Sequence, residues 1–278
     1  MTDERTPTLR KRMKLRATVG EVWAALTVPE ELVRWFPLQA RVEPGVGGSI
    51  TQSWNAEYEG SANILEWDPG KRLTTARTLS LPTEEGTIAE VTITEEWTFE
   101  ARGGAVHLHL EQGGFPEGSA GQEWMDACSR GWDFELRGLR HALERHCGTP
   151  RKVLWCRRLL DLPLESIWDR VMGSGGFAGA GTLPAIKHGD RYEVEPARGP
   201  KLAGCLQLYL PPRDFAATVE GVEDAYLRLR LDPPGFGVEQ AQLHLWLSTF
   251  GVSEDRRESV REEWEAMLDE LFPDQGQD

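Results

Sequence analysis

The sequence predicts an α+β protein made of two tandem domains, each an antiparallel sheet with one long helix laid on it. Three observations lead to this prediction. The chain has 278 residues, which is long for one core and comfortable for two domains of ordinary size. Similar segments recur in the same order in its two halves. Within the first half, two short helical patterns and several period-two strand patterns precede one long helical pattern.

The repeat consists of four pairs of similar segments with similar gaps between them. Each match is short, but their common order indicates a duplicated unit. The third pair aligns His109 with His244, and the fourth aligns Trp132 with Trp264. The matched pairs are EVWAAL (21–26) with SIWDRV (166–171), EWDPGKRL (66–73) with LYLPPRDF (208–215), VHLHLEQGGF (106–115) with QLHLWLSTF (242–250), and GWDFELRGL (131–139) with EWEAMLDEL (263–271).

The boundary between the two units is expected near Gly148-Thr149-Pro150. Glycine and proline end helices, and the long helical pattern stops there. We therefore predict one domain over residues 1–148 and a second over 151–278.

The first domain is expected to open with a strand over residues 9–17, because cationic and apolar side chains alternate there. The cationic row (Arg10, Arg12, Lys14 and Arg16) is interpreted as a solvated sheet face rather than a site for a polyanion. A helix follows from Val19 to Leu26. A second, short helix opens at Pro29, since proline is favoured in the first helical turn.

Five further strands and the long helix complete the first domain. We expect turns at Asp68-Pro69-Gly70 and at Gly103-Gly104. The final helix is predicted from Gly121 to His146, where large residues recur at helical spacing: Cys128, Trp132, Leu136, Leu139 and Leu143. The strands are expected near 47–54, 57–66, 71–79, 87–101 and 105–112.

Composition and charge limit the classes of partner. Hydrophobic residues make up 40% and charged residues 27% of the chain, which is typical of a globular protein. The formal net charge of −14 disfavours binding to nucleic acid or to an anionic membrane, because both require a basic surface. No apolar run approaches the ~20 residues of a membrane span, and the N-terminus lacks the apolar core of a secretory signal. We expect a cytoplasmic protein with no membrane insertion.

The segment GSGGFAGAG, residues 173–181, resembles a loose dinucleotide fingerprint. Such a fingerprint needs its glycines between a buried strand and the start of a helix. Here the glycines follow a predicted helix and run into Thr182-Leu183-Pro184. We therefore interpret the segment as a loop, placed at the mouth of a cavity in the second domain, and expect no nucleotide cofactor.

Cysteine and histidine give no metal or redox motif. Cys128, Cys147, Cys156 and Cys205 are scattered and form no C-x-x-C pair, so free thiols are expected rather than a Cys147–Cys156 disulfide. His107 and His109 share one face of a strand, yet the neighbouring leucines and valine take the opposite, buried face. An exposed pair without a third ligand predicts no metal site.

The first unit resembles the SRPBCC superfamily, which has the START-like or helix-grip fold, and within it the branch named after the activator of the heat-shock-protein-90 ATPase. The resemblance implies two tandem helix-grip domains, the second diverged, each with a curved antiparallel sheet around its C-terminal helix and an enclosed cavity for apolar or amphipathic ligands. The segments that carry it are VWAALTVPEELVRWF (22–36), Gly47-Gly48-Ser49, LEWDPGKRL (65–73), HLEQGGFPEG (109–118) and GWDFELRGLRHAL (131–143).

Glu95 is the candidate polar residue inside such a cavity. It shares one face of the strand 91–99 with Val91, Ile93, Trp97 and Phe99, and a carboxylate in an apolar row is costly to bury unless it is paired or protonated. A β-bulge that turns Glu95 to the solvent is the more ordinary explanation, because register shifts easily by one residue. The candidate cavity residues are Trp35, Phe36, Trp54, Glu95, Trp97, Phe115, Cys128 and Trp132.

Three functions follow from the sequence and the resemblance. The first is a binding protein for a small hydrophobic ligand, without chemistry, since no nucleophile is paired with a base. The second is a cyclase-, aromatase- or hydrolase-like enzyme that works in the same cavity and uses Glu95 as its acid or base. The third is an interaction module with a chaperone partner, for which the residues give least support.

Overall fold

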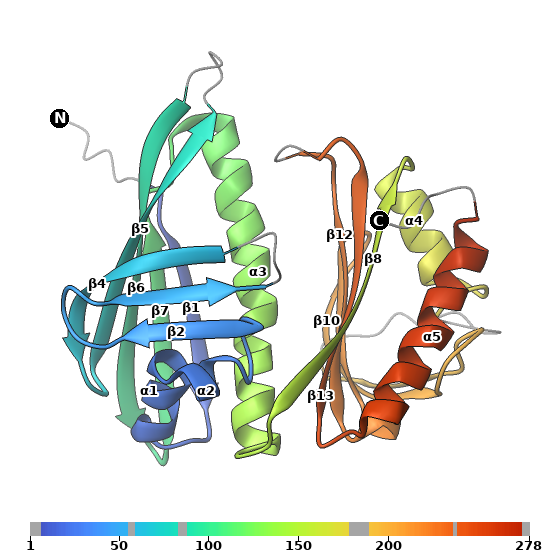
Figure 1. Cartoon of the computed structure of the whole chain (residues 1–278), viewed down its shortest axis with the longest axis horizontal. Coiled ribbons are helices and arrows are strands. Elements are labelled where there is room, and N and C mark those ends of the chain that lie inside the picture. The colour runs from blue at the N-terminus through green and yellow to red at the C-terminus, as the bar shows by residue number, and fades with distance from the viewer. Residues whose placement is uncertain (1–6, 55–58, 83–87, 178–188, 236–237, 274–278) are drawn as a thin grey trace. The chain divides into compact units, whose positions relative to one another are not determined.

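The computed structural model describes residues 7–54, 59–82, 88–177, 189–235 and 238–273. By its internal contacts the chain divides into two compact units, residues 1–148 and 149–278. Each unit holds one antiparallel sheet, and each ends in its longest helix (Figure 1). This architecture confirms the predicted α+β class with two tandem domains.

The first unit contains a seven-stranded sheet in the order β1-β7-β6-β5-β4-β3-β2. The helix α3 lies along one face of this sheet (Figure 1). Its elements are β1 (Leu9–Leu15), α1 (Val19–Thr27), α2 (Pro29–Leu32), β2 (Gln39–Glu43), β3 (Ser49–Ser53), β4 (Glu59–Asp68), β5 (Arg72–Pro82), β6 (Ile88–Arg102), β7 (Ala105–Gly113) and α3 (Gly118–Arg145).

The predicted elements of this unit are present, and one strand was missed. Thr18 caps α1 with its hydroxyl, and Pro29 opens α2 as its first residue. Glycines with positive φ form the turns at Gly70 and at Gly103-Gly104. The missed strand, β2, is a short edge strand of sequence QARVE whose alternate side chains are only partly buried, so its pattern carries little apolar signal.

The second unit contains a six-stranded sheet in the order β8-β13-β12-β11-β10-β9. The helices α4 and α5 lie on one face of it (Figure 1). Its elements are β8 (Arg151–Leu160), α4 (Leu164–Val171), β9 (Arg191–Val194), β10 (Leu202–Leu210), β11 (Asp214–Val219), the 3-10 turn η1 (Glu220–Val222), β12 (Ala225–Asp232), β13 (Ala241–Phe250) and α5 (Glu254–Leu271).

The glycine run of the second unit ends α4 rather than starting a helix. Within the described part, Gly173–Phe177 forms a turn in which the Phe177 amide donates to the Val171 carbonyl over 2.7 Å. A side chain at Gly176 would lie 2.1 Å from that carbonyl oxygen, so the close approach requires glycine there. The Phe177 ring packs edge-on against Trp264, 5.4 Å between centroids. Residues 178–181 lie outside the described residues.

An ion pair joins the first strand of each unit to its last helix. In the first unit Lys11 of β1 pairs with Asp133 of α3 at 2.8 Å. In the second unit Arg158 of β8 lies 2.5 Å from Glu265 and 2.8 Å from Asp269 of α5. The Arg158 side chain is 5% exposed, so its guanidinium is buried, whereas its two acidic partners are partly exposed.

The four cysteines are free thiols, as expected. No helix among the described residues is long and apolar enough to cross a membrane.

Candidate binding cavity in the first unit

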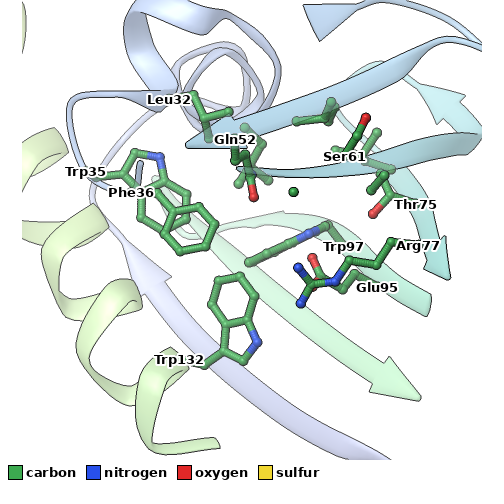
Figure 2. A pocket seen from close by; sticks show the side chains of 15 residues that line it. Leu32, Trp35, Phe36, Gln52, Ser61, Thr75, Arg77, Glu95, Trp97 and Trp132 are labelled. Atoms are coloured by element: carbon green, nitrogen blue, oxygen red, sulfur yellow. The ribbon is translucent and has the colours of Figure 1, made fainter. Parts of the chain in front are cut away.

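The first unit contains a cavity of about 40 Å³ between its sheet, α2 and α3. Figure 2 shows the rings of Trp35, Phe36 and Trp132 on one side, Arg77 with Glu95 on the other, and Trp97 between them. The volume is enough for about three or four water molecules at roughly 10–15 Å³ each. The labelled lining residues are Leu32, Trp35, Phe36, Gln52, Ser61, Thr75, Arg77, Glu95, Trp97 and Trp132.

Glu95 lies on the inward face of β6. Its strand pairs in unbroken register with β5 and β7, so that Glu95 stands opposite Thr75 on one side and Gln112 on the other. The β-bulge that would have turned Glu95 outward is therefore absent, and this explanation is wrong. Neighbouring Trp97 lies on the same inward face and is 4% exposed.

Gln112 of β7 orients the Glu95 carboxyl. The Trp132 indole donates to Gln112 Oε1 over 3.2 Å. Because an indole N–H is only a donor, this bond turns the amide nitrogen of Gln112 toward Glu95, and that nitrogen donates to Glu95 Oε1 over 2.8 Å. Gln112 is 2% exposed, so its amide is shielded from water, and Glu95 is partly buried.

Burial raises the pKa of Glu95 above its ordinary value. The positive charge of Arg77 and the hydrogen bond from Gln112 oppose that rise, because both favour the carboxylate. Arg77 stands two residues beyond Thr75 on the same face of β5, and Figure 2 shows it beside Glu95. The cavity thus holds one acidic and one basic side chain that influence each other.

Aromatic side chains close the other end of the cavity. Phe36 stacks on Trp35, with 5.0 Å between centroids and 17° between planes. Phe36 also contacts Trp132 at 5.2 Å and Trp54 at 5.1 Å. Trp35 is fixed by a 2.8 Å hydrogen bond from its indole to the Ala25 carbonyl. Phe36 is only partly buried, so it is the ring best placed to move.

Five of the eight sequence candidates meet in this cavity: Trp35, Phe36, Glu95, Trp97 and Trp132. Three lie outside its lining. Trp54 stands behind Phe36, and Cys128 is a partly buried thiol on α3. Phe115 is 1% exposed and packs against Trp124 at 5.3 Å, because the turn at Gly114 (φ 92°) carries it away from the inward row of β7.

The polar residues on the strands that flank Glu95 were not predicted from the sequence. Thr75, Arg77 and Gln112 all occupy inward positions of otherwise apolar rows, the same signal that singled out Glu95. His107 and His109 point to the opposite face, as expected. Among the described residues they join no group of metal-ligating side chains.

The second unit lacks these polar residues at the equivalent positions. Because His109 aligns with His244, Gln112 corresponds to Leu247, and the strand pairing in each sheet extends this correspondence to the neighbouring strands. A second, independent match, EWDPGKRL with LYLPPRDF, gives the same alignment for β5 and β11. The equivalent pairs are Thr75 with Ala217, Arg77 with Val219, Glu95 with Leu227, and Gln112 with Leu247.

All four of these second-unit residues are at most 1% exposed and belong to one continuous core. Trp264, the counterpart of Trp132, is fully buried, and its indole N–H has no hydrogen-bond partner among the described residues. The four positions that are polar in the first unit are thus aliphatic in the second. We call Thr75, Arg77, Glu95 and Gln112 the polar quartet.

A curved sheet around a long C-terminal helix, with a cavity between them, defines the first unit as a START-like helix-grip domain. Residues 16–144 match the family model described as "Activator of Hsp90 ATPase homolog 1-like protein". This match confirms the resemblance read from the sequence and covers nearly all of the first unit.

Several solved structures are similar to the chain. The di-domain ARO/CYC BexL from the BE-7585A biosynthetic pathway is 14% identical, with 96% of each chain covered and a TM-score of 0.44. DynU16, described as a putative protein of the dynemicin biosynthetic locus, is 17% identical, with 96% of each chain covered and a TM-score of 0.42. The Aha1 protein from Colwellia psychrerythraea is 19% identical over 51% of this chain and 99% of its own, with a TM-score of 0.40. The comparison with curated proteins found no match.

Proposed function

We propose that the first unit binds a small apolar or amphipathic molecule in the cavity between its sheet and α3. The observation that supports this most is the polar quartet. Thr75, Arg77 and Glu95 line the cavity of the first unit, and Gln112 is hydrogen-bonded to Glu95. Aliphatic side chains occupy the four equivalent positions of the second unit.

The comparison separates what the fold requires from what a ligand would require. Burying polar groups costs free energy unless each is hydrogen-bonded, and burying charge costs more. The second unit closes the same strands over Ala217, Val219, Leu227 and Leu247. The fold therefore does not need the polar quartet, and a bound molecule gives a reason for its presence.

The cavity must enlarge to take a ring. A dry cavity that binds benzene measures about 150 Å³, against about 40 Å³ in this structure. Rotation of Phe36 out of its stack would open the space, because that ring already fills the volume between Trp35 and Trp132. We propose Phe36 as the residue that a ligand displaces.

Native mass spectrometry of gently purified protein, compared with the denatured mass, tests this proposal. We expect an added mass that is lost on denaturation. Gln112→Leu, which installs the second unit's residue, is expected to lower the ligand-bound fraction at least tenfold. Glu96→Gln serves as the matched control, since Glu96 is the next residue on the opposite face of β6. A bare chain mass, together with no heat of binding for naphthalene or 2-naphthol, would contradict the proposal.

An enzyme acting in the same cavity is a second candidate. It is favoured by Glu95, because a carboxyl group whose pKa is raised by burial approaches the range useful for general acid–base catalysis. For any reaction found, Glu95→Gln is expected to lower kcat at least 100-fold. Unchanged turnover in that variant would exclude Glu95 as the acid or base.

The family match also supports a chaperone partner as an alternative. A pull-down with purified Hsp90 that recovers none of this protein would contradict that alternative.

A further inference from the structure

The charges of the cavity are balanced before any ligand enters. Among the described lining residues, Glu95 and Arg77 are the only ionisable side chains. One is acidic and one is basic; burial raises the pKa of Glu95, and the positive charge of Arg77 opposes that rise. At a pH where Glu95 is ionised, the two side chains together add no net charge to the cavity of the first unit.

A charged ligand would disturb this balance. The aromatic end of the cavity offers few hydrogen bonds, and Trp97 and Trp132 are buried. A carboxylate or ammonium group brought inside would leave one uncompensated charge in a medium of low polarity, which is strongly unfavourable. A neutral group adds no charge and needs only hydrogen-bond partners.

The polar end offers both a donor and an acceptor. Arg77 only donates, whereas the Glu95 carboxylate only accepts. One Glu95 oxygen is already bonded to Gln112. A hydroxyl group matches this arrangement, because a single oxygen can accept from Arg77 while its hydrogen is donated to Glu95. Gln52, Ser61 and Thr75 line the same cavity and add further polar contacts.

Resting on the proposed function, we infer that the cavity selects a neutral aromatic or unsaturated ring compound that carries a hydroxyl group, and rejects its carboxylate and ammonium analogues. The rings of Trp35, Phe36, Trp97 and Trp132 would contact the ring of the ligand, and Arg77 with Glu95 would contact the hydroxyl.

Isothermal titration of the full chain with four probes of one ring size tests the inference: naphthalene, 2-naphthol, 2-naphthoate and 2-naphthylmethylammonium. We expect 2-naphthol to bind at least tenfold more tightly than either charged probe, and more tightly than naphthalene. Equal or tighter binding of 2-naphthoate or of the ammonium probe would overturn the inference while leaving the proposed function intact. Binding of none of the four would contradict both.

Two variants that each remove one charge provide an independent readout. Glu95→Gln leaves Arg77 as the only charge, so we expect the ranking to change in favour of 2-naphthoate by at least tenfold relative to 2-naphthol. Arg77→Met leaves Glu95 alone, so we expect the opposite change, toward the ammonium probe. Glu96→Gln, on the outward face, should keep the native ranking. An unchanged ranking in both cavity variants would overturn the inference even if 2-naphthol binds best.

Discussion

Gln112→Leu tests whether the polar quartet acts as a connected unit. Leucine is close to glutamine in size and is the residue found at the equivalent position, Leu247, so the variant leaves no large cavity. Two hydrogen bonds are lost, one from Trp132 at 3.2 Å and one to Glu95 at 2.8 Å. Leaving a buried donor unsatisfied costs about 1–3 kcal/mol, and a hydrogen bond to a charged group contributes about 1.5–3 kcal/mol.

These two losses are partly offset because the variant no longer buries an amide. We therefore expect the free energy of unfolding to fall by about 2–4 kcal/mol. In a Glu95→Leu background the same substitution leaves only the Trp132 indole without an acceptor, and the expected loss is about 1–2 kcal/mol. The two substitutions should thus show a coupling energy of about 1–2 kcal/mol, which is in the range found for contacting residues.

The assay is urea unfolding of the full chain, followed by circular dichroism, for the wild type, both single variants and the double variant. The second unit indicates that such variants can fold, since Trp264 is fully buried beside a leucine-lined core. Additive effects within about 0.5 kcal/mol would refute the reasoning, because they would mean that Gln112 does not connect Trp132 to Glu95.

Three further predictions concern stability. Burial raises the pKa of Glu95. The stability that the protonated Glu95 side chain contributes is therefore full below the ordinary glutamate pKa and is lost as pH rises through the folded-state pKa. In urea unfolding from pH 4 to pH 8, the free energy of unfolding of Glu95→Gln should rise relative to that of the wild type. The expected rise is about 1.4 kcal/mol per pH unit between the unfolded-state and folded-state pKa values of Glu95. A difference that shrinks as pH rises would be inconsistent with a buried carboxyl. Phe36→Ala should lower the free energy of unfolding by about 1–3 kcal/mol in urea unfolding, less than the loss of a fully buried phenylalanine. The same variant should speed naphthalene binding in stopped flow. Slower binding would show that Phe36 is not the residue that a ligand displaces. Arg158→Met should lower the free energy of unfolding by about 1 kcal/mol, since Glu265 and Asp269 are 31% and 48% exposed and can rehydrate. The double variant Glu265→Gln with Asp269→Asn should lower it by about 3 kcal/mol, because it leaves a buried guanidinium without a partner carboxylate. A reversed order of the denaturant midpoints would contradict this.

Much of the architecture could be predicted because it depends on strong periodic patterns. The long helix carries large residues at helical spacing, and Trp132, Leu136 and Leu139 all prove buried. The turns rest on glycine, whose positive φ at Gly70 and Gly104 has few substitutes. The strand β2 could not be predicted in the same way, since a five-residue edge strand pairs through its backbone and needs little apolar sequence.

The candidate site was predictable only in part, because a single strand shows a face but not its neighbours. Glu95 could be singled out from its own apolar row. Its partners Arg77 and Gln112 lie on other strands, and the registers that bring them together depend on hydrogen bonds between chain segments. The size of the cavity could not be predicted from the sequence either, because it depends on how the ring of Phe36 stacks on Trp35.

The duplication makes the polar quartet interpretable. In a single domain, a buried carboxyl held by Gln112 and Trp132 could be explained as a device that fixes the packing of the core. Here the same chain builds the same strands a second time with Leu227 and Leu247 in those places, and Trp264 stays buried without the acceptor that Trp132 has. A tryptophan at that position is thus common to both units, and only its polar partners differ. The packing role therefore belongs to the tryptophan, and this difference between the units is the argument for the binding role that we propose for the residues around Glu95.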